Sequence, residues 1–177
     1  EFVCQSSESV DINVNITPQP DLGPDIFACL HEVVQMEAPT GTGFTYEWFL
    51  NGILTGNTTS SFEYIVADTV EIWLRMNTIN GCDAGDTLII TPLTTPKVTI
   101  SASQSAICLG ESVTLTANIV DAVAFAWWDG FINPTRIVTP EAEGTTYYWA
   151  EVISAANCVY RDSIAITVHP VPDIQLT

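Results

Sequence analysis

The five cysteines are the residues of this 177-residue chain whose spacing most directly suggests chemistry. About 50 positions separate Cys29 from Cys82 and Cys108 from Cys158, whereas Cys4 stands alone. Zinc sites use closely spaced CxxC pairs or paired histidines, and this chain has neither. We therefore predict the disulfides Cys29–Cys82 and Cys108–Cys158, an unpaired thiol at Cys4, and an oxidising, extracellular setting.

Groups that could catalyse a reaction are few. The two histidines, His31 and His169, fall in a turn and a linker, and no serine or cysteine has an evident base beside it. Carboxylate pairs such as Asp83 and Asp86 need a cleft for acid–base chemistry, and short β-rich units seldom form one. We therefore predict no catalytic residues and a protein that is not an enzyme.

The segment from Asp21 to Asp25 is a candidate calcium site. Its sequence, DLGPD, offers carboxylate and carbonyl oxygens, which are the ligands that calcium prefers. It supplies fewer ligands than an EF-hand loop, so an acidic linker turn is the alternative. We expect no other cofactor.

The elements that position these residues occur twice in the chain. At a nearly constant offset the equivalent positions are Cys29 and Cys108, Glu32 and Glu111, Trp48 and Trp127, Trp73 and Trp149, and Cys82 and Cys158. Such a pattern indicates two copies of one unit, residues 18–93 and 94–170. We expect residues 1–17, with Cys4, to be the last strand of a truncated preceding repeat, and residues 171–177 to begin a following repeat.

Each unit has the pattern of antiparallel β-structure. Apolar residues alternate with polar ones, as at Ile72, Leu74 and Met76, which is the period of a half-buried strand. Asn51-Gly52 is a pair that favours a tight hairpin turn. We predict an all-β protein of two tandem immunoglobulin-like β-sandwich domains joined end to end, with flanking strand remnants. The short, proline-bearing joins predict semi-rigid spacers, and each disulfide would pin one end of its sandwich.

The same alternation predicts aromatic side chains on exposed sheet faces. The outward positions on neighbouring strands are Phe49, Trp73, Trp128, Tyr147 and Trp149. Exposed aromatic rings of this kind can stack on sugars or contact a partner. The alternative is that a cross-strand aromatic pair only shields and stiffens the sheet, which is worth about 0.2–1 kcal/mol.

The charge of the chain limits its partners. Four basic residues stand against 21 acidic ones, giving a formal charge of −17. Such a surface repels phosphate backbones and anionic lipid, so we expect neither nucleic acid binding nor membrane insertion. No apolar run approaches the about 18 residues of a membrane span, and no signal peptide pattern is present.

Several motifs carry a family resemblance. The pattern C-x-G-E-x-V-x-L-x-A, followed by Y/F-x-W, TTYYWAEV and N-C-x3-D-S-I-x-I, resembles the Ig-like and PKD-like repeats of Bacteroidota cell-surface proteins. These repeats occur in gliding-motility adhesins of the SprB type and in other substrates of type IX secretion. The resemblance implies an extracellular protein whose parent is attached to the outer membrane.

The same resemblance suggests two functions. The first is a set of spacer and display repeats in a large adhesin for cell adhesion or gliding motility, whose partners are a surface polysaccharide or another cell-surface ligand and neighbouring repeats of the same chain. The second is a carbohydrate-binding accessory module of a secreted hydrolase. The triplets at Asp68, Asp86 and Asp162 also resemble sites that Bacteroidota glycosylate, although such triplets equally suit strand entries.

Overall fold

A computed structural model describes residues 7–12 and 14–172 of the chain. The described residues form fourteen β-strands and no helix, so the protein is all-β, as predicted. Within the described part, no helix therefore has the length and apolar character that a bilayer span needs. The chain divides into two compact units, the first comprising the residues up to Ala28 and Glu32–Thr91, the second Cys29–His31 and the residues from Pro92 onward.

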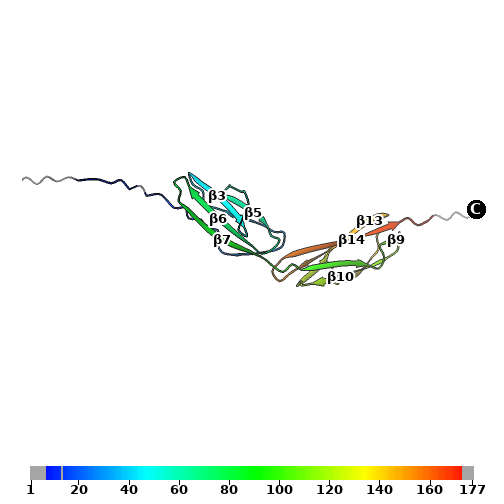
Figure 1. Cartoon of the computed structure of the whole chain (residues 1–177). Helices are drawn as coiled ribbons and strands as arrows, with labels where there is room; N and C mark the ends of the chain where they lie inside the picture. Colours follow the sequence, from blue (N-terminus) through cyan, green and yellow to red (C-terminus); the bar gives the residue numbers. More distant parts are fainter. Residues whose placement is uncertain (1–6, 13, 173–177) are drawn as a thin grey trace, which may run out of the picture. The chain divides into compact units, whose positions relative to one another are not determined.

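The first unit contains seven strands in two sheets (Figure 1). They are β1 (Ile26–Ala28), β2 (Val33–Glu37), β3 (Phe44–Leu50), β4 (Ile53–Leu54), β5 (Ser61–Ile65), β6 (Val70–Thr78) and β7 (Asp83–Pro92). One sheet has the order β1-β7-β6-β3-β4, and the other pairs β2 with β5. Strand β6 shows the expected alternation, because Ile72, Leu74 and Met76 are fully buried and the residues between them are not.

Trp48 lies at the centre of the first core. Its side chain is fully buried and stacks on Phe62 at a ring distance of 5.4 Å. The indole Nε1–H donates to the backbone oxygen of Thr59 at 2.9 Å, which satisfies a polar group that would otherwise be costly to bury. A tryptophan can therefore occupy the middle of this sandwich.

The second unit repeats this arrangement with seven further strands. They are β8 (Lys97–Ala102), β9 (Ala106–Cys108), β10 (Val113–Val120), β11 (Ala124–Trp127), β12 (Thr135–Val138), β13 (Gly144–Ile153) and β14 (Val159–His169). One sheet has the order β12-β10-β8 and the other β11-β13-β14-β9. Trp127 is buried at the centre, and its Nε1–H donates to the backbone oxygen of Asn133 at 2.9 Å. Both units are immunoglobulin-like sandwiches, as predicted.

The predicted hairpin at Asn51-Gly52 is confirmed. Both residues have positive φ, 47° and 77°, in the turn that joins β3 to β4. The Asn51 side chain accepts a hydrogen bond from the backbone N–H of Glu71 at 3.0 Å, which ties the turn to the start of β6.

An aspartate on the last strand of each unit holds the first segment of that unit in place. Asp86 Oδ2 accepts the backbone N–H of Leu22 at 2.6 Å, and Asp162 Oδ2 accepts the backbone N–H of Ile100 at 3.0 Å. The D-T/S-aliphatic triplets at these positions therefore have a structural role, while Thr87 and Ser163 within them are exposed.

The strand predicted for residues 1–17 is not formed in its described part. Residues 7–12 and 14–17 do not form a strand, and the side chains of Val10, Ile12, Val14 and Ile16 are at least 80% exposed. A strand needs a neighbour for its backbone N–H and C=O groups, and no other described segment pairs with this one. Its alternating pattern alone does not create a sheet.

Candidate functional site

The outer face of the five-stranded sheet of the first unit carries an aromatic pair. Phe49 on β3 and Trp73 on β6 lie opposite each other in the antiparallel ladder, with ring centroids 4.6 Å apart. Both side chains are half-buried, whereas their neighbours Ile72 and Leu74 on the inner face are fully buried. The first unit therefore contains the cross-strand pair that the alternation predicts.

The surroundings of Trp73 shape this aromatic face. A Cβ on Gly85 of β7 would lie 2.5 Å from Trp73 Nε1, so the absence of a side chain there gives the indole its place. Beside it, Arg75 reaches Asp83 at 3.3 Å and Glu47 at 3.6 Å. These ion pairs are exposed and contribute little stability, about 0–1 kcal/mol, but they place polar groups next to the rings.

The second unit presents different residues on its corresponding face. Tyr147 and Trp149 on β13 are 69% and 37% exposed, whereas Tyr148 and Ala150 are buried, which confirms the predicted outward direction. The guanidinium of Arg161 on β14 lies 4.8 Å from the centre of the Trp149 ring. This face therefore carries the exposed Tyr147 side chain next to Trp149, whose indole ring is partly covered by the Arg161 guanidinium.

The prediction for Trp128 is wrong. Its ring packs 4.8 Å from Tyr148 and 5.8 Å from Trp127, and it lies against the core rather than pairing with Trp149 on the outer face. The reason is the length of the strand. In the first unit β3 continues to Leu50, but β11 ends at Trp127, so Trp128 belongs to the following turn and leaves the alternation.

Arg136 covers Trp128 in an arrangement that sequence reasoning missed. Its guanidinium lies 4.2 Å from the centre of the Trp128 ring and 5.2 Å from that of Phe131. Its Nη1 is 2.6 Å from Asp129 Oδ1, and this hydrogen bond lowers the pKa of the Asp129 carboxyl below its usual value. Burial raises the pKa of Tyr148 nearby. The signal available in the sequence was that Arg136 is one of only four basic residues.

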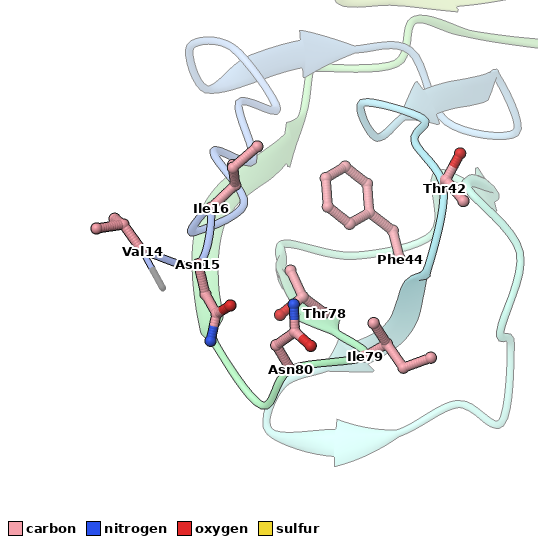
Figure 2. A pocket seen from close by; sticks show the side chains of 8 residues that line it. All are labelled: Val14, Asn15, Ile16, Thr42, Phe44, Thr78, Ile79 and Asn80. Carbon is pink, nitrogen blue, oxygen red and sulfur yellow. The ribbon is translucent and has the colours of Figure 1, made fainter. Parts of the chain in front are cut away.

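A groove lies at one end of the first unit. It has a volume of about 400 Å³ and lies between residues 14–16, Thr42, Phe44 and the turn at 78–80. Figure 2 shows the Phe44 ring and the Ile16 side chain on either side of this space.

An equivalent groove of about 470 Å³ lies in the second unit between residues 93–94, 121–123 and 154–156. These segments occupy nearly the same repeat positions as those around the first groove. The hollow is therefore a property of the repeat rather than of one copy. Each groove also borders the turn that leads to a cysteine, Cys82 in the first unit and Cys158 in the second.

A disulfide joins Cys29 to Cys158, whose Cα atoms are 5.5 Å apart. Cys29 belongs to the first sequence repeat, residues 18–93, although Cys29–His31 group with the second compact unit, and Cys158 belongs to the second sequence repeat, residues 94–170. Cys82 and Cys108 are free thiols, the first half-buried and the second exposed. The predicted pairs Cys29–Cys82 and Cys108–Cys158 are therefore wrong, and Cys4 lies outside the described residues.

Strand direction explains this correction in the second unit. Strand β9 runs parallel to β14, and Cys108 lies opposite His169, the last residue of the 11-residue β14. Cys158 immediately precedes Val159, where β14 begins. At about 3.3 Å per residue the two cysteines are roughly 35 Å apart along the strand, whereas a disulfide needs Cα atoms within about 4.4–6.8 Å.

The first unit has the same geometry. Two hydrogen bonds indicate a parallel arrangement: the backbone N–H of Leu22 donates to the Asp86 carboxylate, and further along both segments the backbone N–H of Ile89 donates to the Asp25 carboxylate. Strand β1 therefore proceeds toward the end of β7, and Cys29 follows it there. Cys82 precedes the other end of β7, so a disulfide between Cys29 and Cys82 of the first repeat would have to span the strand.

The candidate calcium residues have other contacts. Asp21 Oδ1 accepts the backbone N–H of Gly23, and Asp25 Oδ1 accepts the backbone N–H of Ile89, each at 2.9 Å. No group of three or more acidic, histidine or cysteine side chains suited to a metal occurs among residues 7–12 and 14–172. Calcium binding at this turn stays an untested prediction.

The two histidines lie at structural positions that differ from each other. His31 has a φ of 68° in the turn before β2, where the second repeat has Gly110 with a φ of 90°. His169 is the last residue of β14. Neither has a counterpart histidine in the other repeat.

Comparisons with known proteins support the Ig-like assignment. Residues 94–170 match the family described as "Ig-like domain CHU_C associated", so this region is an Ig-like domain. A search of curated protein sequences found no match.

Similar solved structures include the fibronectin(III)-like modules of Clostridium thermocellum CbhA, with 13% identity over 90% of this chain and 98% of that chain and a TM-score of 0.36. They also include a tandem of titin Ig domains, with 9% identity over 84% of this chain and 94% of that chain and a TM-score of 0.36. The insect immune protein hemolin has 13% identity over 90% of this chain and 49% of that chain, with a TM-score of 0.46.

Proposed function

We propose that these units are spacer and display repeats of a large secreted adhesin on a cell surface. The observation that supports this most strongly is that the two units share their core contacts, whereas the side chains on their outer sheet faces differ. Trp48 and Trp127 have the same buried position and the same kind of indole hydrogen bond. Asp86 and Asp162 hold the first segment of each unit in the same way. What the copies share stabilises the sandwich, which is the property that a spacer needs.

The outer faces differ in a way that suits display. The first unit presents a stacked Phe49–Trp73 pair, and the second presents Tyr147 and Trp149 with Arg161 beside them. A cell-surface ligand such as a polysaccharide would contact these faces, while neighbouring repeats extend the chain. A non-catalytic role, an extracellular location, export by the type IX system and a part in gliding motility belong to the same proposal. The Cys29–Cys158 disulfide supports the extracellular location, since such bonds persist in oxidising compartments.

Small-angle X-ray scattering of the 177-residue chain tests the spacer role. A single compact domain of this length has a radius of gyration of about 16 Å. Two sandwiches that extend end to end should give a clearly larger radius and a scattering profile typical of a rod. A radius near that of one compact domain would contradict the spacer proposal.

A second function is a carbohydrate-binding accessory module of a secreted hydrolase. The exposed aromatic side chains favour it, because aromatic rings stack on sugar faces. A glycan array probed with the intact chain tests this function. Glycan binding that is lost in each of the single variants Trp73→Ala and Trp149→Ala, but kept in the control variant Phe131→Ala, would support the carbohydrate-binding function. Absence of binding to any glycan would contradict it.

A further inference from the structure

The cysteines of the two repeats fall into two classes by their place in the fold. Cys29 and Cys108 come at the end of the short strands β1 and β9, and we call them the strand-end cysteines. Cys82 and Cys158 come directly before the last strands β7 and β14, and we call them the turn cysteines. The disulfide among the described residues joins one member of each class, Cys29 and Cys158.

The free turn cysteine has the same backbone setting as the bonded one. The backbone oxygen of Cys158 accepts a hydrogen bond from the backbone N–H of Ser154 at 2.9 Å, and the backbone N–H of Cys158 donates to Ser154 Oγ at 3.1 Å. In the first repeat, the backbone oxygen of Cys82 accepts the backbone N–H of Thr78 at 2.9 Å, and the backbone N–H of Cys82 donates to Thr78 Oγ1 at 3.1 Å. The equivalent groove borders both turns. Cys82 is therefore held in the conformation in which Cys158 forms its disulfide.

The free strand-end cysteine also resembles its bonded equivalent. Two residues after Cys29 the backbone turns through the left-handed region at His31, and two residues after Cys108 it does so at Gly110. The Cys108 N–H donates to Glu111 Oε2 at 2.8 Å, so the carboxylate fixes this turn. The Cys108 side chain is exposed, which leaves its thiol open to a partner.

Neither free thiol can repeat the bond inside its own repeat. The strand-end and turn cysteines of one repeat lie at opposite ends of the last strand, roughly 35 Å apart. The observed bond instead links the strand-end cysteine of residues 18–93 to the turn cysteine of residues 94–170. It thus connects one copy of the repeat to the next along the chain.

We propose that Cys108 and Cys82 are the two open ends of a disulfide ladder. Cys108 bonds the turn cysteine of a further copy of the repeat, and Cys82 bonds the strand-end cysteine of another. Each join between successive copies then carries one disulfide in addition to the peptide linker. This inference rests on the equivalence of the two repeats and does not depend on the adhesin proposal.

The chemistry of each new bond is a two-electron oxidation. Two thiols lose two protons and two electrons as the S–S bond forms. Glutathione disulfide is a suitable oxidant, because exchange through a mixed disulfide passes both electrons to it and releases two molecules of reduced glutathione. The exposed Cys108 thiol is the more accessible site for the first exchange step.

The test uses two variants of the intact chain that each keep one free thiol. The double variant C4S/C82S keeps Cys108, and the double variant C4S/C108S keeps Cys82. An equimolar mixture is oxidised in a glutathione redox buffer, and the dimers are separated by non-reducing electrophoresis and assigned by peptide mass mapping. We expect the mixed Cys108–Cys82 dimer to exceed either symmetric dimer by about tenfold or more, because only this pair combines the two classes.

Three results would overturn the proposal. The first is a random 1:2:1 mixture of the three dimers. The second is the absence of any dimer although both thiols form adducts with glutathione. The third is mapping of Cys29–Cys82 or Cys108–Cys158 bonds within the unmodified chain. The triple variant C4S/C82S/C108S is the control, since it should remain monomeric with Cys29–Cys158 intact.

Discussion

In the second unit the Asp162 carboxylate accepts a hydrogen bond from the backbone N–H of Ile100, just as in the first unit the Asp86 carboxylate accepts one from the backbone N–H of Leu22. In each case a carboxylate on the last strand of a sandwich holds the first segment of the same sandwich. Leu22 lies outside the strands, and Ile100 lies on β8, an edge strand that pairs only with β10, so each segment has one side that the carboxylate can hold. The two aspartates are therefore expected to be important for stability.

Replacement of Asp162 by alanine should lower the free energy of unfolding of the second unit by about 1–3 kcal/mol, because it leaves a partly buried N–H without its charged acceptor. Urea denaturation followed by tryptophan fluorescence measures this change. Ser163→Ala is the matched control, since that side chain is exposed on the same strand. Equal effects of the two substitutions would show that the aspartate does not hold the segment.

Truncation of Trp127 should be far more damaging than truncation of Trp149. Trp127 is 1% exposed at the core, so Trp127→Ala should cost about 3–5 kcal/mol. Trp149 is 37% exposed, and Trp149→Ala should leave the fold intact with a loss below about 1 kcal/mol. Thermal unfolding of both variants checks the difference, and comparable losses would contradict the strand register of β13.

The contact between Arg136 and Asp129 should be visible in an acid titration. Because the hydrogen bond lowers the pKa of Asp129 in the folded protein, its stabilising effect is complete above the unfolded pKa and is lost as the pH falls through the folded pKa. In Arg136→Met the pKa of Asp129 should rise toward its usual value. Carboxyl chemical shifts followed by NMR measure the pKa, and an unchanged Asp129 titration would argue against the contact.

Thiol mapping of the untreated protein should find a peptide that links Cys29 to Cys158. An alkylating reagent without denaturant should modify Cys108 rapidly and Cys82 more slowly, since the first is exposed and the second half-buried. Mass spectrometry before and after reduction gives both results. Resistance of Cys108 to alkylation until the protein is unfolded would contradict the exposure of this thiol.

The alternation of apolar and polar residues determined much of this protein from its sequence. It identified the inward side of β6 at Ile72 and Leu74, and the outward direction of Trp149, because a strand has a side-chain period of two wherever it continues. Repeat comparison located the equivalent tryptophans, because the same core position requires the same residue type in each copy. These inferences need only local geometry.

Only the tertiary structure decided which side chains Trp128 contacts and which cysteines pair. Alternation does not tell where a strand ends, so it placed Trp128 on the outer face although β11 stops one residue earlier. Spacing does not tell which way a paired strand runs, so it joined Cys108 to Cys158 across the length of β14. The parallel pairing of β9 with β14 puts these two cysteines at opposite ends of the sandwich, and a disulfide can form only where two Cα atoms come within a few ångströms.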